Sequence, residues 1–228
     1  AFLSTGSSVF NNEQIKVRKG EVNKKPKRGY FSYTKRHEPH TDRIIISDIK
    51  WVDDPHGDIC IYLEPQKGFP YVLGGDPANG GADAFVGQVI DNVSKTQCAV
   101  YSKVGVDPDL YAYQLYCLGH YFNDALIGTE TNVTGSVMKT LLNCEYPNLY
   151  YRKVEDKATH QILDQIGVKT TVITKPIMID KYKAIFRENP NVINDYTTLC
   201  EMETFIVADT PSIKNSLTTT RAEDGKHD

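Results

Sequence analysis

The amino-acid sequence predicts an α/β domain built on a mixed central sheet and flanked by helices. Two observations lead to this fold class. Three apolar runs at 69–75, 84–90 and 97–104 are separated by short turns, which is the pattern of an antiparallel meander. Patterns typical of a helix, a strand, a helix and a strand then follow as far as residue 152, which is the order of βαβ units. A meander followed by βαβ units makes a sheet with both antiparallel and parallel strands.

Short strands are expected before the meander, at 30–33, 44–46 and 59–63. Pro55 and Gly57 indicate a turn between the second and the third of these strands. The first expected helix follows the meander. Asp107 is suited to the N-cap and Pro108 to the first helical position, and apolar residues recur at helical spacing across 109–123. The remaining expected elements are a strand at 125–130, a helix at 134–143, a strand at 148–152, a weakly helical segment at 156–167, a helix at 179–188, a turn of helix at 198–203 and a strand at 205–208.

Composition excludes several classes of protein. The chain has 228 residues, of which 40% are apolar and 24% charged, which is ordinary for a globular protein and not for a disordered one. No apolar run approaches the roughly 18 residues of a membrane span, and the first residues lack the pattern of a signal peptide. The five cysteines are scattered without a CxxC pair, which predicts reduced thiols and neither a disulfide framework nor a zinc site. Because the chain does not begin with methionine, we expect it to be part of a longer protein.

The charge is unevenly distributed along the chain. The net charge is −3, but residues 16–43 carry ten basic and three acidic side chains, and the rest of the chain is strongly acidic. This basic stretch, which also contains aromatic residues, is either a phosphate-binding surface beside a metal centre or a solvated linker whose charge keeps it soluble. The first 30 residues are polar and are expected to be largely irregular. The candidate DNA contacts in this stretch are Lys24, Lys25, Lys27, Arg28, Lys35 and Arg36.

Two acidic residues stand at strand ends. Asp76 closes the first strand of the meander, and Glu130 closes the strand that begins at residue 125. If these strands are adjacent and parallel, both carboxylates emerge at the same edge of the sheet, where open α/β sheets bind ligands. Crowded carboxylates suit Mg²⁺ or Mn²⁺, and a pair of such ions can activate water against a phosphodiester. The alternative is that Asp76 is a turn residue before Pro77 and that Glu130 is a charge at the start of a helix.

Three runs of the sequence, taken in order, resemble one known family. They are Gly74–Ala78 (GGDPA), Gly128–Asn132 (GTETN) and Gly225–Asp228 (GKHD), and they are similar to the motifs of the C-terminal nuclease domain of phage terminase large subunits. The resemblance implies an RNase H-like fold and a metal-dependent endonuclease that cuts concatemeric duplex DNA, with little sequence specificity, during capsid packaging. It also implies that Asp76, Glu130 and Asp228 are the catalytic metal ligands, with two Mg²⁺ or Mn²⁺ ions.

The opening run Leu3–Phe10 resembles the segment that follows the ATPase domain in this family. Residues 1–30 are therefore expected to be a linker from an absent N-terminal ATPase domain, and residues 31–228 the nuclease domain. The expected partners in the full-length protein are that ATPase domain, the small terminase subunit and the capsid portal, in the cytoplasm of the infected host cell and without a membrane. The sequence contains no GxxxxGK[ST], so we expect no ATP hydrolysis by this chain.

Several residues have a second interpretation. The chain stops at Asp228, before the next acid of the family pattern, so Asp224 is an alternative third ligand. Asp83 is either a fourth carboxylate or a turn cap. His227 either orients water or a phosphate or is a free surface histidine. Asn132 either hydrogen-bonds near Glu130 or a phosphate, or caps the helix expected to begin near residue 134.

Two rival functions fit the same residues. The first is a nuclease of the Holliday-junction-resolvase type, which would prefer four-way junctions to linear duplex DNA. The second is a module without catalytic activity that docks a protein partner during packaging or recombination, in which the acids serve only as turn caps.

Overall fold

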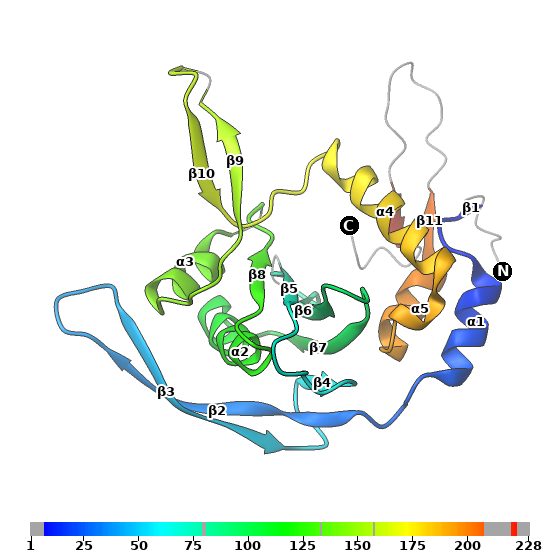
Figure 1. Cartoon of the computed structure of the whole chain (residues 1–228), viewed down its shortest axis with the longest axis horizontal. Helices are drawn as coiled ribbons and strands as arrows, with labels where there is room; N and C mark the ends of the chain where they lie inside the picture. Colours follow the sequence, from blue (N-terminus) through cyan, green and yellow to red (C-terminus); the bar gives the residue numbers. More distant parts are fainter. Residues whose placement is uncertain (1–6, 79–80, 133, 157, 208–219, 223–228) are drawn as a thin grey trace. The chain divides into compact units, whose positions relative to one another are not determined.

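The chain divides into two compact units. The structure is a computed structural model, and it describes residues 7–78, 81–132, 134–156, 158–207 and 220–222. One unit is Lys25–Lys169, and the other combines Ala1–Lys24 with Thr170–Asp228 (Figure 1). Each unit has its own cluster of buried apolar residues, so the two are described one after the other.

The unit Lys25–Lys169 is built on a mixed sheet. Among the described residues this sheet has seven strands in the order β3-β2-β4-β7-β6-β5-β8 (Figure 1). All neighbours are antiparallel except β5 and β8, which are parallel. The predicted fold class is therefore confirmed, with a meander of β5, β6 and β7 followed by a parallel strand. The strands are β2 (Lys27–His37), β3 (Ile44–Asp53), β4 (Ile59–Ile61), β5 (Tyr71–Asp76), β6 (Ala84–Asp91), β7 (Gln97–Val104) and β8 (Leu126–Thr129).

Two helices pack against this sheet. Helix α2 (Pro108–Tyr121) begins as predicted, with Asp107 at the N-cap and a proline in its first turn, and α3 (Ser136–Asn143) packs beside it. The side chains of α2 that face the sheet are fully buried and join one cluster with the inward side chains of the meander. Burial alternates along β6 and the first part of β5, whereas the first five residues of β7 are all buried. The central members of this cluster are Leu73, Val89, Tyr101, Tyr111, Leu115 and Leu118.

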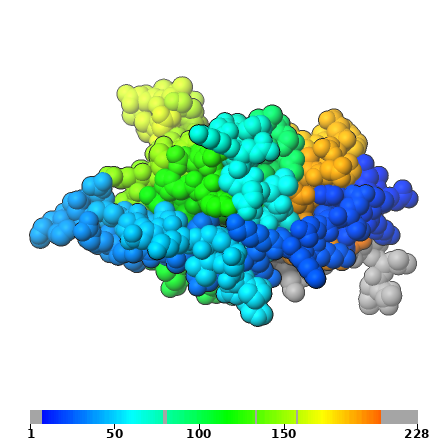
Figure 2. Space-filling view, turned by 60° about the horizontal axis from the view of Figure 1, so that its bottom comes forward, coloured from blue at the N-terminus to red at the C-terminus, as the bar shows by residue number. Residues whose placement is uncertain are grey.

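Strands β2 and β3 form a ribbon much longer than the two short strands expected. They pair from Gly29 opposite Asp53 to His37 opposite Ile44, with a bulge between Ser32 and Thr34. Figure 2 shows this ribbon in lighter blue, extending away from the body of its unit. The outer half of β2 is polar, whereas β3 begins with three isoleucines, of which Ile44 is buried in a cluster with Tyr113 and Cys144. The length of the ribbon was not visible in the sequence because backbone pairing, and not apolar alternation, extends the two strands.

Beyond β8 the structure departs from the prediction. Strand β9 (Tyr151–Glu155) pairs with β10 (Ile162–Ile166) in a separate two-stranded hairpin. The strand expected at 148–152 contributes only an isolated bridge between Leu149 and Ile127 to the main sheet. The weakly helical segment expected at 156–167 is wrong, because its second half is β10. Most of β10 is exposed, so it has no buried face that would produce a strand pattern in the sequence.

The second unit is largely helical. Its small core combines residues near the N-terminus with residues beyond 185, among them Phe10, Ile15, Phe186 and Leu199. In the described part of the chain no helix is both long enough and apolar enough to cross a membrane. The elements are β1 (Ser7–Ser8), α1 (Asn12–Glu21), α4 (Thr174–Glu188), η1 (Pro190–Val192), α5 (Tyr196–Thr204), β11 (Phe205–Val207) and β12 (Thr220–Ala222), and the three strands form one antiparallel sheet.

The N-terminal segment is more regular than predicted. The first 30 residues were expected to be largely irregular, but they contain α1 and the start of β2. The Asn11 side chain caps α1 by accepting from the backbone N–H groups of Glu13 and Gln14. Ile15 is the buried residue of this polar helix. The sequence therefore lacks the apolar stripe by which an amphipathic helix is recognised. The role of residues 1–30 as a linker from an ATPase domain stays a prediction.

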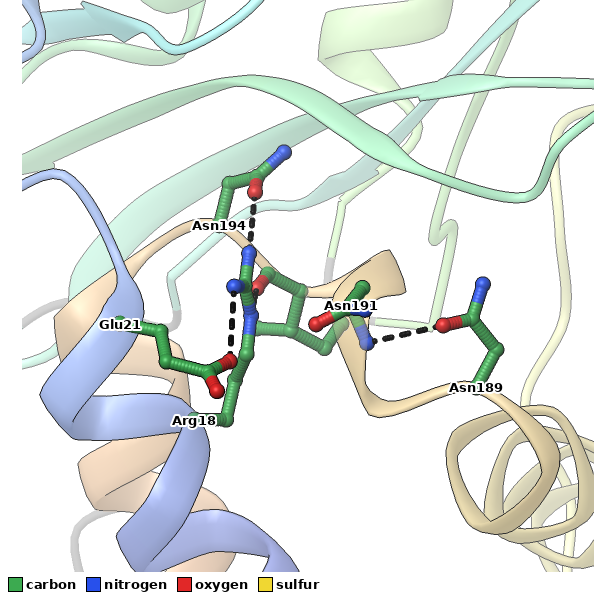
Figure 3. A network of polar contacts seen from close by, with 6 residues as sticks. Arg18, Glu21, Asn189, Asn191 and Asn194 are labelled. Atoms are coloured by element: carbon green, nitrogen blue, oxygen red, sulfur yellow. Dashed lines mark hydrogen bonds and ion pairs between the residues drawn. The ribbon is translucent and has the colours of Figure 1, made fainter.

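Polar contacts of Arg18 complete the attachment of α1 within its unit (Figure 3). The Arg18 Nε donates to the backbone oxygen of Ile193 at 2.8 Å, and its Nη2 donates to Oδ1 of Asn194 at 2.7 Å. Glu21, one turn further along α1, lies 3.4 Å from Arg18 Nη1. In the same loop, Asn189 caps the short helix η1 by accepting from the backbone N–H of Asn191. Part of the basic charge of the N-terminal stretch is therefore used inside the fold.

The packing of α2 generates a stability prediction. Leu115 is fully buried, whereas Leu110 on the same helix is 43% exposed. Leu115→Ala should lower the free energy of unfolding by about 2–5 kcal/mol, because it removes buried methyl groups and leaves a cavity. Leu110→Ala should cost less than about 1 kcal/mol. Urea unfolding followed by circular dichroism measures both, and equal losses would contradict the packing described here.

Candidate metal centre

The parallel pairing of β5 and β8 brings Asp76 and Glu130 to the same end of the sheet. Gly75 lies opposite Thr129 in this pair, and the backbone N–H of Glu130 donates to the Gly75 oxygen at 2.8 Å. The next position on each strand is the acidic residue. Adjacent strands lie about 4.8 Å apart, so the two carboxylate-bearing residues are neighbours. The condition on which the shared site depends, that these two strands are adjacent and parallel, is met.

Both acidic side chains project from the same face of the sheet. Tyr71 and Leu73 are buried in the cluster that contains α2, and alternation along β5 places Asp76 on the opposite face. On β8, Ile127 and Thr129 are buried in the same way, which places Glu130 on that opposite face as well. Asp76 is exposed and Glu130 is half-buried. Two oxygen donors side by side at an exposed strand end are ligands of the type that Mg²⁺ and Mn²⁺ prefer.

The face that carries the two acids is open at Gly74 on β5, whereas on β8 a Cβ atom at Gly128 would lie 3.2 Å from the side chains of Tyr150 and Val168. Gly74 precedes Asp76 by two positions and lies opposite Gly128 on β8. A Cβ atom at Gly74 would meet no other atom within 4 Å. A large ligand such as a nucleic-acid backbone would therefore not be blocked at this position by a side chain.

The strand that carries Glu130 is held on its other side by the base of the β9–β10 hairpin. Glu130 forms an isolated parallel bridge with Val168, and the backbone N–H of Thr131 donates to the Val168 oxygen at 2.8 Å. Arg152 Nη1 donates to the Gly167 oxygen at 2.9 Å and to Thr131 Oγ1 at 3.4 Å. Arg152 is thus a cation close in space, though not in sequence, to the residue after Glu130. Sequence reasoning missed Arg152 because it belongs to no motif.

Tyr111 lies beneath Asp76. It is fully buried on α2, and its hydroxyl donates to the backbone oxygen of Val86, the residue opposite Asp76 on β6. Burial, and after it the negative charge of Asp76, raises the pKa of Tyr111 well above its ordinary value. Burial therefore favours the protonated form of the Tyr111 hydroxyl, in which it donates to the Val86 oxygen.

The third ligand of the predicted centre falls outside the described residues. Asp228, its alternative Asp224 and the auxiliary His227 all belong to 223–228, so their placement relative to Asp76 and Glu130 is not described. Within the described ranges, no group of three or more histidine, cysteine, aspartate or glutamate side chains is arranged to hold a metal ion. Two of the three predicted ligands are brought together, and the roles of all three stay predictions.

The remaining candidates near the centre differ in position. Asp83 is exposed and immediately precedes β6, the strand paired with β5. Asn132 is exposed two residues after Glu130. Helix α3 has Gly135 at its N-cap, and the hydroxyl of Thr134 accepts from the backbone N–H of Ser136, so the alternative that Asn132 caps this helix is wrong.

The predicted DNA contacts do not form one compact cluster. Lys27 and Arg36 are nine positions apart on β2, which corresponds to about 30 Å. Lys27 Nζ lies 2.9 Å from Glu64 and over the rings of Trp51 and Tyr121, and Arg28 Nε donates to the Gly57 oxygen at 2.7 Å.

The other members of the predicted set differ in their surroundings. Lys24 belongs to the other unit, where its ammonium lies over the ring of Tyr196. Lys25 and Arg36 are exposed. Lys35, also exposed, lies on the outer half of the ribbon with its ammonium over the ring of Tyr113. Lys35 and Arg36 are therefore the adjacent pair that the ribbon presents to solvent.

The architecture defines the class of fold: it is the RNase H-like fold of phage large terminase nuclease domains. Among solved structures, the large terminase nuclease from thermophilic phage G20c with bound magnesium is 14% identical, with a TM-score of 0.59 over 96% of this chain and 89% of that one. The same nuclease with bound cobalt is 18% identical, with a TM-score of 0.56 over 74% and 80% of the two chains. The nuclease domain of the Thermus phage P74-26 large terminase is 16% identical, with a TM-score of 0.55 over 76% and 80%.

No protein-family model and no curated protein sequence matches the chain. At these identities the likeness to solved structures concerns the fold, and at that level the resemblance drawn from the three sequence motifs is confirmed. The motif GGDPA contains the end of β5, whose last residue is Asp76. The motif GTETN contains the end of β8, and Glu130 is the next residue.

The contacts of Arg152 generate a prediction about the hairpin. Arg152→Ala leaves the backbone oxygens of Ile166 and Gly167 without their side-chain donor, so the base of the hairpin should open more often. Hydrogen exchange of the amides in 162–168 should become several-fold faster. Lys153→Ala is the matched control, because Lys153 is exposed and pairs with Asp164 across the hairpin. Equal exchange in both variants would remove Arg152 from this role.

Proposed function

We propose that this chain is a metal-dependent endodeoxyribonuclease, the nuclease domain of a viral DNA-packaging terminase. The observation that carries the proposal is the pair of carboxylates on the parallel strands β5 and β8, in a fold shared with large terminase nucleases. Two structures of the phage G20c nuclease were solved with magnesium and with cobalt bound, which supports a divalent cation at a centre of this kind.

Asp76 and Glu130 would hold the cation, and Asp228, or Asp224 in its place, would complete the site. One or two Mg²⁺ or Mn²⁺ ions, when bound, supply a nucleophilic water and stabilise the charge that develops on the phosphodiester. The chain itself contributes the two adjacent carboxylates, held by the pairing of their strands, and the open surface at Gly74 along which a duplex can approach.

The substrate would be duplex DNA bound through its phosphates, with little sequence specificity. Lys35 and Arg36 on the β2–β3 ribbon are the candidate contacts that best fit this role, because both are exposed and adjacent. In the full-length protein we propose that this domain works beside an ATPase domain, the small terminase subunit and the capsid portal, in the cytoplasm of the infected cell.

Cleavage of plasmid DNA tests the proposed activity. With Mn²⁺ present the protein should nick and linearise supercoiled plasmid, and EDTA should stop it. Asp76→Asn should lower the rate by more than about 100-fold, because even residues that only support a metal ligand are worth 10–100-fold. The control is Asp42→Asn, since Asp42 is an exposed acid between β2 and β3.

Three other outcomes would contradict the proposal. If the Asp76 variant cuts DNA at the wild-type rate, Asp76 does not belong to the site. If the wild type does not cut DNA at all, a module without catalytic activity is favoured. Preferential cutting of four-way junctions would favour a resolvase.

Salt dependence of DNA binding tests the predicted contacts. The doubly substituted Lys35→Ala, Arg36→Ala protein should bind duplex DNA more weakly and reduce the slope of log K against log salt by about 2, since each phosphate contact contributes about 0.9. Lys139→Ala serves as the control, because Lys139 is an exposed lysine on α3 outside the predicted set. Fluorescence anisotropy of a labelled duplex without metal gives both slopes, and an unchanged slope in the double variant would exclude the ribbon as a DNA contact.

A further inference from the structure

Tyr111 makes a polar contact at the end of the β5–β6 ladder that packing alone does not require. Its ring is buried between Phe85 and Tyr101, with ring centroids 5.2 and 5.3 Å away. Its hydroxyl donates to the backbone oxygen of Val86 at 2.5 Å. Val86 lies directly opposite Asp76 in the antiparallel pair of β5 and β6. The hydroxyl therefore reaches the point where the ladder that carries Asp76 ends.

The same hydroxyl also contacts the backbone of Asp76. The backbone of Asp76 lies close enough to the Tyr111 oxygen to influence the pKa of this hydroxyl, which donates to the Val86 oxygen. Strand ends fray because their last backbone groups lack a partner. A buried hydroxyl that binds the backbone oxygen opposite Asp76 holds the end of the ladder from which the Asp76 carboxylate faces the metal centre.

Gly75 is the residue that permits this approach. A Cβ atom at position 75 would lie 2.6 Å from the Tyr111 oxygen and 2.7 Å from Cγ2 of Thr129. The Thr129 side chain is fully buried against this glycine and precedes Glu130 in the chain. Tyr111, Gly75 and Thr129 therefore form one close-packed support behind the two acidic residues, on the face of the sheet opposite their carboxylates.

We propose that Tyr111 is a positioning residue for the metal centre, which sets the place of the Asp76 carboxylate by holding the Asp76 backbone. This inference rests on the proposed function, in which Asp76 is a metal ligand. Groups that orient a ligand commonly change metal affinity by 10–100-fold when they are removed. The contact here is made to the backbone, so the effect on affinity should fall near the lower end of that range.

Calorimetric titration of Mn²⁺ into Tyr111→Phe tests the inference. The ring and its packing are kept and only the hydroxyl is lost, so the expected result is a folded protein with about 10-fold weaker Mn²⁺ binding. Tyr146→Phe is the matched control. Tyr146 is also buried, and its hydroxyl donates to the Ala125 oxygen at 2.7 Å, just before the opposite end of β8. Wild-type affinity in the Tyr111 variant, or an equal loss in the Tyr146 variant, would overturn the proposal.

A measurement without metal separates positioning from general destabilisation. Hydrogen exchange of the Asp76 amide should be several-fold faster in Tyr111→Phe than in the wild type and unchanged in Tyr146→Phe, because only the first variant loses a hydrogen bond at the end of the β5–β6 ladder. Gly75→Ala, made independently, should displace the hydroxyl and weaken Mn²⁺ binding in the same direction. If the Asp76 amide exchanges at the wild-type rate in Tyr111→Phe, the proposal that Tyr111 holds the Asp76 backbone is wrong.

The two proposals can fail separately. If the wild-type protein takes up no Mn²⁺, the proposed function fails. If the wild type binds Mn²⁺, Asp76→Asn does not, and Tyr111→Phe binds as the wild type does, then only the positioning role of Tyr111 is wrong.

Discussion

The candidate centre depends on a single strand pairing, the parallel one between β5 and β8. Every other neighbouring pair in the main sheet is antiparallel, and antiparallel neighbours would send the ends of the two strands to opposite edges. The register matters as much as the direction. Gly75 lies opposite Thr129, so the acids that follow are neighbours on one face, and a slip of one residue would turn one carboxylate toward the buried face under α2. The hydrogen bond from the Glu130 N–H to the Gly75 oxygen ties this register to the ends of both strands.

Placing two carboxylates side by side has an electrostatic cost that the surroundings moderate. Asp76 is exposed, so water screens its charge, and Glu130 is half-buried. The support on the buried face supplies no ion pair: Tyr111 contributes a hydroxyl, Gly75 the absence of a side chain and Thr129 packing. The nearby cation, Arg152, donates to backbone oxygens and to the Thr131 hydroxyl. A divalent ion between the two carboxylates would relieve their mutual repulsion, which the neighbouring residues named here do not neutralise.

The sequence predicted the two acids because an apolar strand that ends in a charged residue is visible as a pattern. It did not reveal their support. Tyr111 is one of several aromatic residues in a buried helix, and only the three-dimensional contact distinguishes its hydroxyl from theirs. Arg152 lies on a hairpin whose second strand is exposed, so neither β10 nor the arginine follows a hydrophobic period. Helix α1 was missed for the same reason, since Ile15 is its buried residue. Patterns that arise from burial were found, and those that arise from polar contacts were not.

The same distinction changes the interpretation of the basic N-terminal stretch, which its charge alone presents as one surface. Arg18 and Lys19 hold their own unit together, through the Ile193 oxygen and Glu203 respectively. Lys27 is occupied by Glu64 and two aromatic rings. A cation that is already paired loses part of its interaction when it turns to a phosphate, so these residues contribute less to DNA affinity than their charge suggests. Because the basic residues before Arg28 are paired to different extents, we expect the DNA contact on the exposed outer part of β2 and not in residues 16–28. This part of β2 belongs to the same unit as Asp76 and Glu130.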